Sequence, residues 1–186
     1  MSAPPAAMPG APPAPPTGNV HRGVRVIKVV VNTGVGESGE ARTRAARVLE
    51  MVTHQKPVAT RSHSTNRDFG IRKGQEIGAK VTLRGSVARE FLGRAFEARD
   101  KQLDVDSIDR NGNFSFGIAD YTDFTGMKYD PQIGIHGMDV SVEMGRAGFR
   151  IRQRRVQSRP LPKALRSTRE ETRAYLTHTL GVTLLE

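Results

Sequence analysis

TRSHSTNRDFGIRKGQEIGAKVTLRG, residues 60–85, predicts both a strand of the main sheet and the projection that leads into it. The segment begins polar, passes a glycine-containing tip, and ends with apolar residues at every second position. Such alternation is typical of a strand with one buried face, so we expect an arm at about residues 60–78 that returns into a sheet. The basic residues near its tip have too few apolar neighbours to form a core, which favours an anionic partner. The alternating apolar residues are Ile77, Ala79, Val81 and Leu83.

The charge balance narrows the class of partner. The 186 residues include 29 Lys and Arg against 19 Asp and Glu, a formal net charge of +10. This excess favours nucleic acid or an anionic membrane surface. Aromatic residues make up only 5% and Trp is absent, which argues against a protein that binds single strands mainly by stacking bases. Because the chain has no cysteine, disulfides, thiolate zinc sites and cysteine nucleophiles are excluded.

The N-terminal segment differs in composition from the rest. Residues 1–20 are rich in Pro and Ala and almost uncharged, so we predict a disordered leader there and a single domain over residues 21–186. The leader lacks the basic start and apolar block of a secretory signal, and no apolar run reaches the roughly 18 residues of a membrane span. We therefore expect a soluble, cytoplasmic protein without membrane contact.

A glycine-rich loop follows the first predicted strand. Residues 24–31, VRVIKVVV, are β-branched as in a central strand, and residues 40–52 have helical periodicity. The loop between them matches the G-x-G-x-x-G pattern of dinucleotide sites, but such a site needs an acidic residue about 20 positions on. The sequence there is HQKP, residues 54–57. A nucleotide-dependent enzyme is kept as an alternative hypothesis. The glycines concerned are Gly34, Gly36 and Gly39.

Several elements follow the arm. A helix is predicted to open at Ser86, a short strand at residues 114–118, and a long strand within residues 133–144. Thr168, with Glu171 three residues later, is a capping-box signal for a final helix. The apolar stripe expected to make the helix after Ser86 part of the core is Val87, Phe91, Leu92 and Ala95.

Two segments are rich in arginine. The C-terminal region, about residues 146–186, contains basic residues at a density that is hard to attribute to an ordinary solvated face. The predicted helix at residues 40–52 carries three arginines outside its apolar stripe, and these form either a solvated face or a surface that meets RNA. They are Arg42, Arg44 and Arg47.

No catalytic or metal-binding constellation is evident. The five histidines lack the spacing of a metal pair on one helix, and the serines lack a G-x-S-x-G motif. Asp68-Phe69-Gly70 matches a kinase tripeptide without the other kinase motifs. The acidic segment at residues 104–113 lacks the spacing of a calcium loop, so a turn is expected there. We expect no enzyme, no metal and no cofactor.

Five segments, in order, resemble one family. The chain from about residue 24 to its end is similar to the 5S-rRNA-binding large-subunit ribosomal protein of universal family five. The resemblance is to its archaeal type, the counterpart of eukaryotic large-subunit protein eleven. The segments that carry the resemblance are VVVNTGVGESGE at 29–40, QKP at 55–57, RDFGIRKG at 67–74, IGAKVTLRG at 77–85, and the FGI to MKYDPQIGIHGMDV block at 116–140.

The resemblance implies an α+β fold: an antiparallel β-sheet with helices packed on one face, a long protruding hairpin, and a basic C-terminal extension. It implies a structural constituent of the large ribosomal subunit, seated in the central protuberance. The implied partners are 5S rRNA, large-subunit rRNA, peptidyl-site tRNA and neighbouring ribosomal proteins, including protein thirteen of the small-subunit head. A free homo-oligomer is not expected. A non-ribosomal RNA-binding module of the same fold stays open as an alternative.

The resemblance also assigns residues to partners. Asn32, Gln55 and Thr82 match polar positions of the family that contact 5S rRNA. The full set expected at 5S rRNA is Asn32, Thr33, Gly34, Gln55, Lys56, Lys80, Thr82 and Arg84. The set expected at tRNA is Arg61, Ser62, His63, Arg67, Arg72 and Lys73. The basic C-terminal residues expected at rRNA are Arg150, Arg152, Arg154, Arg155, Arg159 and Lys163.

Two features depart from the family pattern. Many relatives carry Gly where this chain has His54. Residues 61–66 are less basic than expected, so the arm would rely more on Arg67, Arg72 and Lys73. The resemblance also gives the glycine-rich loop a role in RNA binding. Its small residues would let an RNA backbone approach closely, and main-chain amides at the start of the following helix would favour phosphate.

Overall fold

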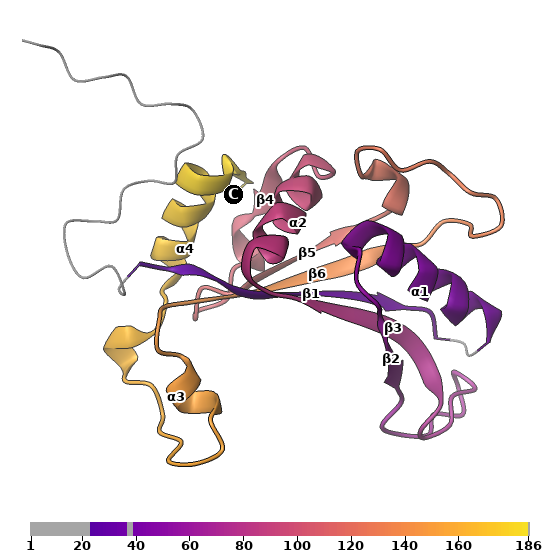
Figure 1. Ribbon diagram of the computed structural model, residues 1–186, viewed down its shortest axis with the longest axis horizontal. Helices are drawn as coiled ribbons and strands as arrows, with labels where there is room; N and C mark the ends of the chain where they lie inside the picture. The colour runs from indigo at the N-terminus through magenta and orange to yellow at the C-terminus, as the bar shows by residue number, and fades with distance from the viewer. Residues whose placement is uncertain (1–22, 37–38, 186) are drawn as a thin grey trace, which may run out of the picture.

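The β-branched run forms the central strand of the computed structural model, β1 (Arg25–Gly34) (Figure 1). The structure describes residues 23–36 and 39–185, so the leader predicted at residues 1–20 lies outside the described part. β1 continues past the predicted end at residue 31 because Asn32 and Thr33 still pair with the neighbouring strand. The first predicted strand is therefore confirmed and extended.

All pairings in the main sheet are antiparallel, with β1 between β3 and β6. The predicted α+β architecture with an antiparallel sheet is confirmed. The five strands, in their order across the sheet, are β2 (Val58–Arg61), β3 (Glu76–Leu83), β1, β6 (Met138–Gly145) and β5 (Phe114–Ile118).

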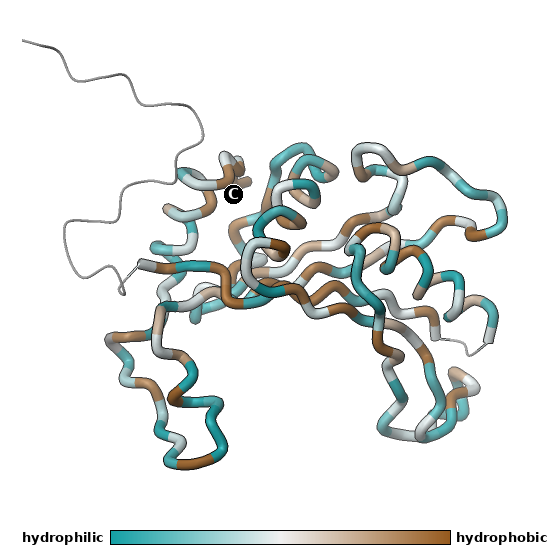
Figure 2. Tube along the Cα trace, viewed as in Figure 1, coloured by the Kyte–Doolittle hydropathy of each residue, from teal (hydrophilic) through white to brown (hydrophobic). Residues whose placement is uncertain are grey.

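Two helices cover one face of this sheet (Figure 1). They are α1 (Glu40–Thr53) and α2 (Gly85–Glu97). Alternate strand residues, such as Val29 and Val31 of β1, are buried under them. The apolar residues gathered between sheet and helices form the core (Figure 2). Rings contribute to it, with Phe96 stacked on Phe116 at 4.9 Å between centroids.

The start of α2 differs from the prediction. The helix begins at Gly85 with Arg84 as its N-cap, so Ser86 is already inside it. Val87, placed in the core by the sequence, is 39% exposed, whereas Ala88 is buried. The difference arises because Ala88, Phe91 and Leu92 repeat at the spacing of one helical face, and Val87 is about 100° away from Ala88 around the axis.

The strand predicted within residues 133–144 is shorter than expected. Residues before Met138 form a loop, since the amides of Ile133 and Gly134 both donate to the carbonyl of Asp130. Gly134 has φ +79°, outside the extended region. The predicted strand at residues 114–118 is confirmed as β5.

The C-terminal part returns to the helix side of the sheet. The predicted capping box is confirmed at the start of α4 (Arg169–Tyr175), which continues as a π-helical turn, η5 (Leu176–Leu180). The chain closes with β7 (Thr183–Leu185), which pairs in parallel with β4 (Gln102–Asp104) in a separate two-stranded sheet. This pair of strands was not predicted from the sequence.

Shorter helical turns occur in the connections. Within the described residues, no helix is long and apolar enough to cross a membrane. The short turns are η2 (Val105–Ser107), η3 (Tyr121–Asp123), α3 (Arg150–Gln153) and η4 (Lys163–Leu165).

Candidate nucleic-acid interface

The face of the sheet away from α1 and α2 is open between two projections of the chain (Figure 1). We call it the open face. It follows from strand alternation, because residues next to the buried ones point the other way. The strand residues on it are Lys28, Val30, Asn32 and Gly34 of β1, Lys80 and Thr82 of β3, Val58 and Thr60 of β2, Asp139, Ser141 and Glu143 of β6, and Ser115 and Gly117 of β5.

The strand register arranges the polar side chains of the open face in rows. Asn32 lies opposite Lys80 on one side and Asp139 on the other. In the next row, Val30 lies between Thr82 and Ser141. Side chains directly opposite one another in a sheet are about 5 Å apart at Cβ. The amide of Asn32, the ammonium group of Lys80 and the hydroxyl of Thr82 therefore lie close together on the open face.

The register divides the residues predicted to contact 5S rRNA. Asn32, Lys80 and Thr82 lie together on the open face, with Gly34 two residues beyond Asn32. Thr33 points the other way: its side chain is 3% exposed, and its hydroxyl has no hydrogen-bond partner among the described residues. The Thr33 side chain is therefore part of the core beneath the helices.

The remaining residues of that set flank the open face. Arg84 is exposed and in extended conformation directly after β3, which continues the alternation from Thr82. Gln55 and Lys56 are exposed between α1 and β2. Because Val58 pairs with Lys80, continuing this antiparallel register brings both residues toward the end of the sheet occupied by Thr82 and Arg84.

The first projection is the arm, residues 61–75, an ordered hairpin. Main-chain hydrogen bonds join Ser62 to Gln75 and Asn66 to Ile71, and a turn at Gly70 reverses the chain. The side chain of Phe69 is 74% exposed at this turn. The residues predicted at tRNA all belong to the arm, and all are exposed except the half-buried Ser62: Arg61, Ser62, His63, Arg67, Arg72 and Lys73.

An acidic residue at the base fixes the arm to the domain. The Glu76 carboxylate lies 3.3 Å from the guanidinium group of Arg42 in α1 and 3.5 Å from that of Arg61 in β2. These ion pairs join a helix and two strands where the arm leaves the sheet. Arg61 is therefore engaged at the base, whereas the basic residues nearer the tip remain available.

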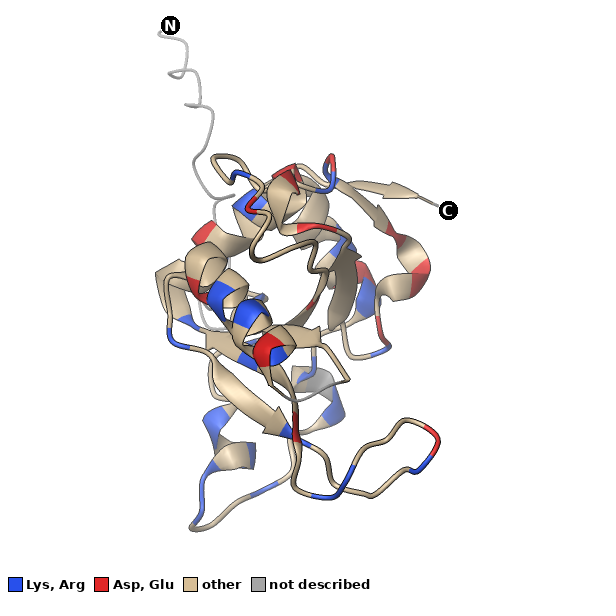
Figure 3. Cartoon of the chain, turned by 90° about the vertical axis from the view of Figure 1, so that its right-hand side faces the viewer, with Lys and Arg blue, Asp and Glu red and all other residues tan. Residues whose placement is uncertain are grey.

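The second projection, residues 146–166, is named the basic loop. It descends on the other side of the open face from the arm (Figure 1), and Lys and Arg gather on both projections and along α1 (Figure 3). Its predicted rRNA-contacting residues are all exposed: Arg150, Arg152, Arg154, Arg155, Arg159 and Lys163. Internal bonds order it, including one from the Arg159 amide to the Ile151 carbonyl at 3.3 Å.

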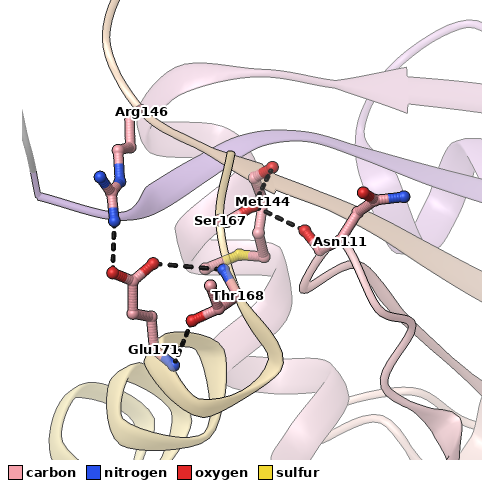
Figure 4. Close-up of polar contacts among 6 residues, drawn as sticks. All are labelled: Asn111, Met144, Arg146, Ser167, Thr168 and Glu171. Carbon is pink, nitrogen blue, oxygen red and sulfur yellow. Dashed lines mark hydrogen bonds and ion pairs between the residues drawn. The ribbon is translucent and has the colours of Figure 1, made fainter. Parts of the chain in front are cut away.

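Both ends of the basic loop are fixed to the domain (Figure 4). Arg146 forms an ion pair with Glu171 of α4. The other carboxylate oxygen of Glu171 accepts from the Thr168 amide at 3.2 Å, which completes the capping box. The Ser167 hydroxyl donates to the Asn111 carbonyl at 2.6 Å. The loop therefore leaves β6 and enters α4 at defined points.

Comparisons with known proteins cover most of the chain. The sequence model of ribosomal protein L5 matches residues 19–72, and that of the ribosomal L5P family C-terminus matches residues 76–177. The chain is 51% identical to large ribosomal subunit protein uL5 of Picrophilus torridus, over 91% of this chain and 97% of that protein. The chain belongs to the ribosomal protein L5 family. The family resemblance inferred from the sequence is confirmed.

Other archaeal relatives have similar coverage. The uL5 protein of Thermoplasma acidophilum is 48% identical over 87% of this chain and 96% of its own length. That of Methanosphaera stadtmanae is 44% identical over 89% of this chain and 99% of its own. The likeness therefore spans the sheet, both projections and α4.

Members of the L5 family are structural ribosomal proteins, not enzymes, which rejects the nucleotide-dependent alternative. The fold gives an independent reason, because a dinucleotide site needs a parallel strand-helix-strand crossover and both neighbours of β1 are antiparallel. The amides of Val35 and Gly36 both donate to the Ile77 carbonyl at 3.0 Å. These two amides are therefore already used within the protein, and the phosphate contact predicted for amides at the start of α1 stays a prediction.

The arginines of α1 lie on the helix side of this L5 family member, away from the open face (Figure 3). Arg42 pairs with Glu76, and Arg44 lies 3.8 Å from Glu40 one turn earlier in the same helix. These arginines therefore share no surface with Asn32, and both interpretations of them, a solvated face or a surface that meets RNA, stay predictions. Elsewhere in the domain, burial raises the pKa of the Tyr175 hydroxyl and the charge of Arg89 lowers it, and this partly buried ring packs against the core.

Three open-face residues of this L5 domain were not predicted from the sequence: Lys28, Asp139 and Glu143. Lys28 Nζ lies 3.0 Å from the carboxylate of Glu143, which also lies 3.9 Å from the guanidinium group of Arg152 in the basic loop. Their signal in the sequence was alternation, since each is next to residues that are buried. Alternation does not tell which of the two faces of the sheet is covered, because this depends on where the helices lie.

Proposed function

We propose that this chain binds 5S rRNA on its open face and contacts peptidyl-site tRNA with the arm. Family membership makes it a structural ribosomal protein of the large subunit, acting in the cytoplasmic ribosome. The observation that carries the proposal is the position of Asn32, Lys80 and Thr82 on one open face, between two exposed basic projections. No reaction is part of this role.

The open face supplies contacts that fix the position of the RNA. Asn32 offers amide donors and an acceptor, Thr82 a hydroxyl, and Lys80 a cation for phosphate. Gln55, Lys56 and Arg84 extend the surface at its edge. The basic loop adds exposed arginines that bind large-subunit rRNA. Neutralisation of phosphates by the basic residues of both surfaces supplies most of the affinity for RNA.

The arm is the proposed tRNA contact. Its own hydrogen bonds order it before binding, which reduces the entropy lost when it meets a partner. Arg67, Arg72 and Lys73 are exposed near the turn, and the arm projects beyond the open face. It can therefore reach a second RNA while the sheet holds the first.

The loop between η3 and β6 is the proposed contact with neighbouring proteins, including protein thirteen of the small-subunit head. It exposes Tyr129 and Ile135, 57% and 68% respectively. Exposed aromatic and aliphatic groups of this kind suit a protein partner better than a phosphate backbone. The loop leaves the domain away from the basic loop (Figure 1), so both contacts are compatible.

The direct test is equilibrium binding of the full chain to 5S rRNA and to an unrelated structured RNA of equal length, over a range of salt. We expect selective binding of 5S rRNA at every salt concentration. The logarithm of its affinity should fall linearly with that of the salt, by roughly 0.7 to 0.9 per phosphate neutralised. Equal affinity for both RNAs would refute the proposal.

A further inference from the structure

One end of the open face is a shallow hollow lined by small residues together with Ile118, Met138 and Asp139. Gly34, Gly117, Ala119, Gly137 and Asp139 contribute to it. Gly117 lies opposite Asp139 in the pairing of β5 with β6, and Asn32 lies opposite Asp139 on the other side. We call this site the glycine hollow.

The space over two of these glycines is empty. A Cβ atom added to Gly34 would meet nothing within 4 Å, and one added to Gly117 would meet only a carboxylate oxygen of Asp139 at 3.8 Å. Neither has a positive φ, so the backbone does not require glycine at these positions. The absence of side chains there leaves bare peptide planes exposed on the floor of the hollow.

Asp139 is an unexpected residue on a surface that faces RNA. Its side chain is exposed and, within the described part of the chain, has no hydrogen bond or ion pair. Glu143, the other acid on this face, is held by Lys28. A free carboxylate repels phosphate and so reduces affinity for a nucleic-acid backbone. Asp139 therefore suits a different part of the RNA.

A base edge with two adjacent donors fits this carboxylate. An ionised carboxylate only accepts hydrogen bonds and can accept two in parallel. Among the four RNA bases, guanine alone presents two neighbouring N–H donors, N1–H and N2–H, on its Watson–Crick edge. RNA-binding proteins read such edges on bases that have left the stack.

We propose that the glycine hollow binds an unstacked guanine of the bound RNA. The ring lies on the peptide plane at Gly34, with its N1–H and N2–H donating to Asp139, while Gly117 on the other side of Asp139 leaves this carboxylate uncovered. The Asn32 amide, beside Asp139, donates to the guanine O6. This inference rests on the proposed 5S rRNA binding and adds a base-specific contact to it.

The test is chemical probing of 5S rRNA with a dicarbonyl reagent that modifies N1 and N2 of unpaired guanines, with and without the full-length protein. We expect the wild-type chain to protect one such guanine. Asp139→Asn should abolish this protection and weaken 5S rRNA binding roughly 5- to 150-fold, the range for loss of a bidentate base contact. Gly34→Ala should act similarly, because its methyl group would occupy the space of the ring.

Two matched variants serve as controls. Glu97→Gln removes one negative charge from an exposed position on α2, and Gly93→Ala adds a methyl group on the same helix where nothing lies within 4 Å. Both should retain the protected guanine and wild-type affinity. Circular dichroism and thermal unfolding of each variant verify that the fold is intact.

The outcomes separate the two proposals. If the wild-type chain fails to prefer 5S rRNA, the proposed function is refuted. If it prefers 5S rRNA but protects no guanine, only the guanine site is refuted. The same holds if Asp139→Asn binds as tightly as wild type, or more tightly, since a simple surface acid would give that result.

Discussion

Lys28 and Glu143 join the central strand to β6 through an ion pair of 3.0 Å on the open face. The Glu143 side chain is only 16% exposed, and its carboxylate also lies 3.9 Å from Arg152. On a surface proposed to bind RNA, the negative charge of Glu143 thus orients the positive charges of Lys28 and Arg152. The basic loop is connected to the sheet at this point.

Replacing Glu143 with Gln should weaken rRNA binding although it removes a negative charge. Without the carboxylate, Arg152 loses its partner and the basic loop loses a contact with the sheet. We expect affinity to fall by a few-fold and stability by about 1 kcal/mol, measured by filter binding and urea unfolding. Glu90→Gln, at an exposed position on α2, is the control for charge alone. Tighter binding by the Glu143 variant would show that this carboxylate only repels RNA.

Gly112→Ala should destabilise the domain strongly. Its φ is +74°, and an added Cβ would lie 2.4 Å from the Thr172 hydroxyl and 2.9 Å from the Thr168 carbonyl. Overpacking and backbone strain together should cost roughly 2–4 kcal/mol, visible as a lower unfolding midpoint in denaturant. Gly93→Ala, in the interior of α2 with open space around it, should instead gain up to about 1 kcal/mol. Equal effects of the two substitutions would contradict the packing described at Thr172.

His54→Gly should stabilise the protein. His54 ends α1 in the left-handed conformation, with φ 54° and ψ 25°, where a side chain is strained and glycine is favoured. The expected gain is roughly 0.5–1 kcal/mol, measured by thermal unfolding. The neighbouring Gln55, which lacks a positive φ, provides the comparison: Gln55→Gly should lower stability slightly. A loss in the His54 variant would indicate that the imidazole makes a compensating contact.

The open face and the arm should be separable by mutation. Asn32→Ala and Thr82→Ala should each weaken 5S rRNA binding roughly tenfold, because hydrogen bonds at fixed positions are lost. A chain in which a two-glycine turn replaces residues 64–72 should bind 5S rRNA normally and retain peptidyl-site tRNA less well in reconstituted ribosomes. If shortening the arm weakens 5S rRNA binding as much as Asn32→Ala does, the assignment of the two surfaces is wrong.

The sequence predicted features encoded by neighbouring residues better than features that depend on register. β-Branched composition located β1, helical periodicity located α1, and Thr168 with Glu171 marked the start of α4. Thr33 was predicted at 5S rRNA together with its neighbour Asn32. It lies two and four residues after Val31 and Val29, on the same face of β1, and its side chain therefore points into the core. The side of the sheet that a residue faces can be assigned only when the alternation of buried and exposed residues is followed along the whole strand.

Features that join distant segments were not predictable in the same way. β4 and β7 are three residues each and pair across some eighty positions, too short for a period to be recognised. The contact of Arg152 with Glu143 depends on the path of the basic loop. The glycine hollow depends on the register of three strands, since Gly34, Gly117 and Asp139 have no relation in the linear sequence.

The central position of β1 affects how the protein is synthesised. Translation produces this valine-rich strand early, whereas its second neighbour, β6, ends only at Gly145. Until then one edge of β1 is exposed on the nascent chain, and an unpaired apolar edge can associate with other chains. The face that carries Asn32 and Asp139 also stays incomplete for this period. Completion of this face therefore waits for residues 138–145 to leave the ribosome that makes them.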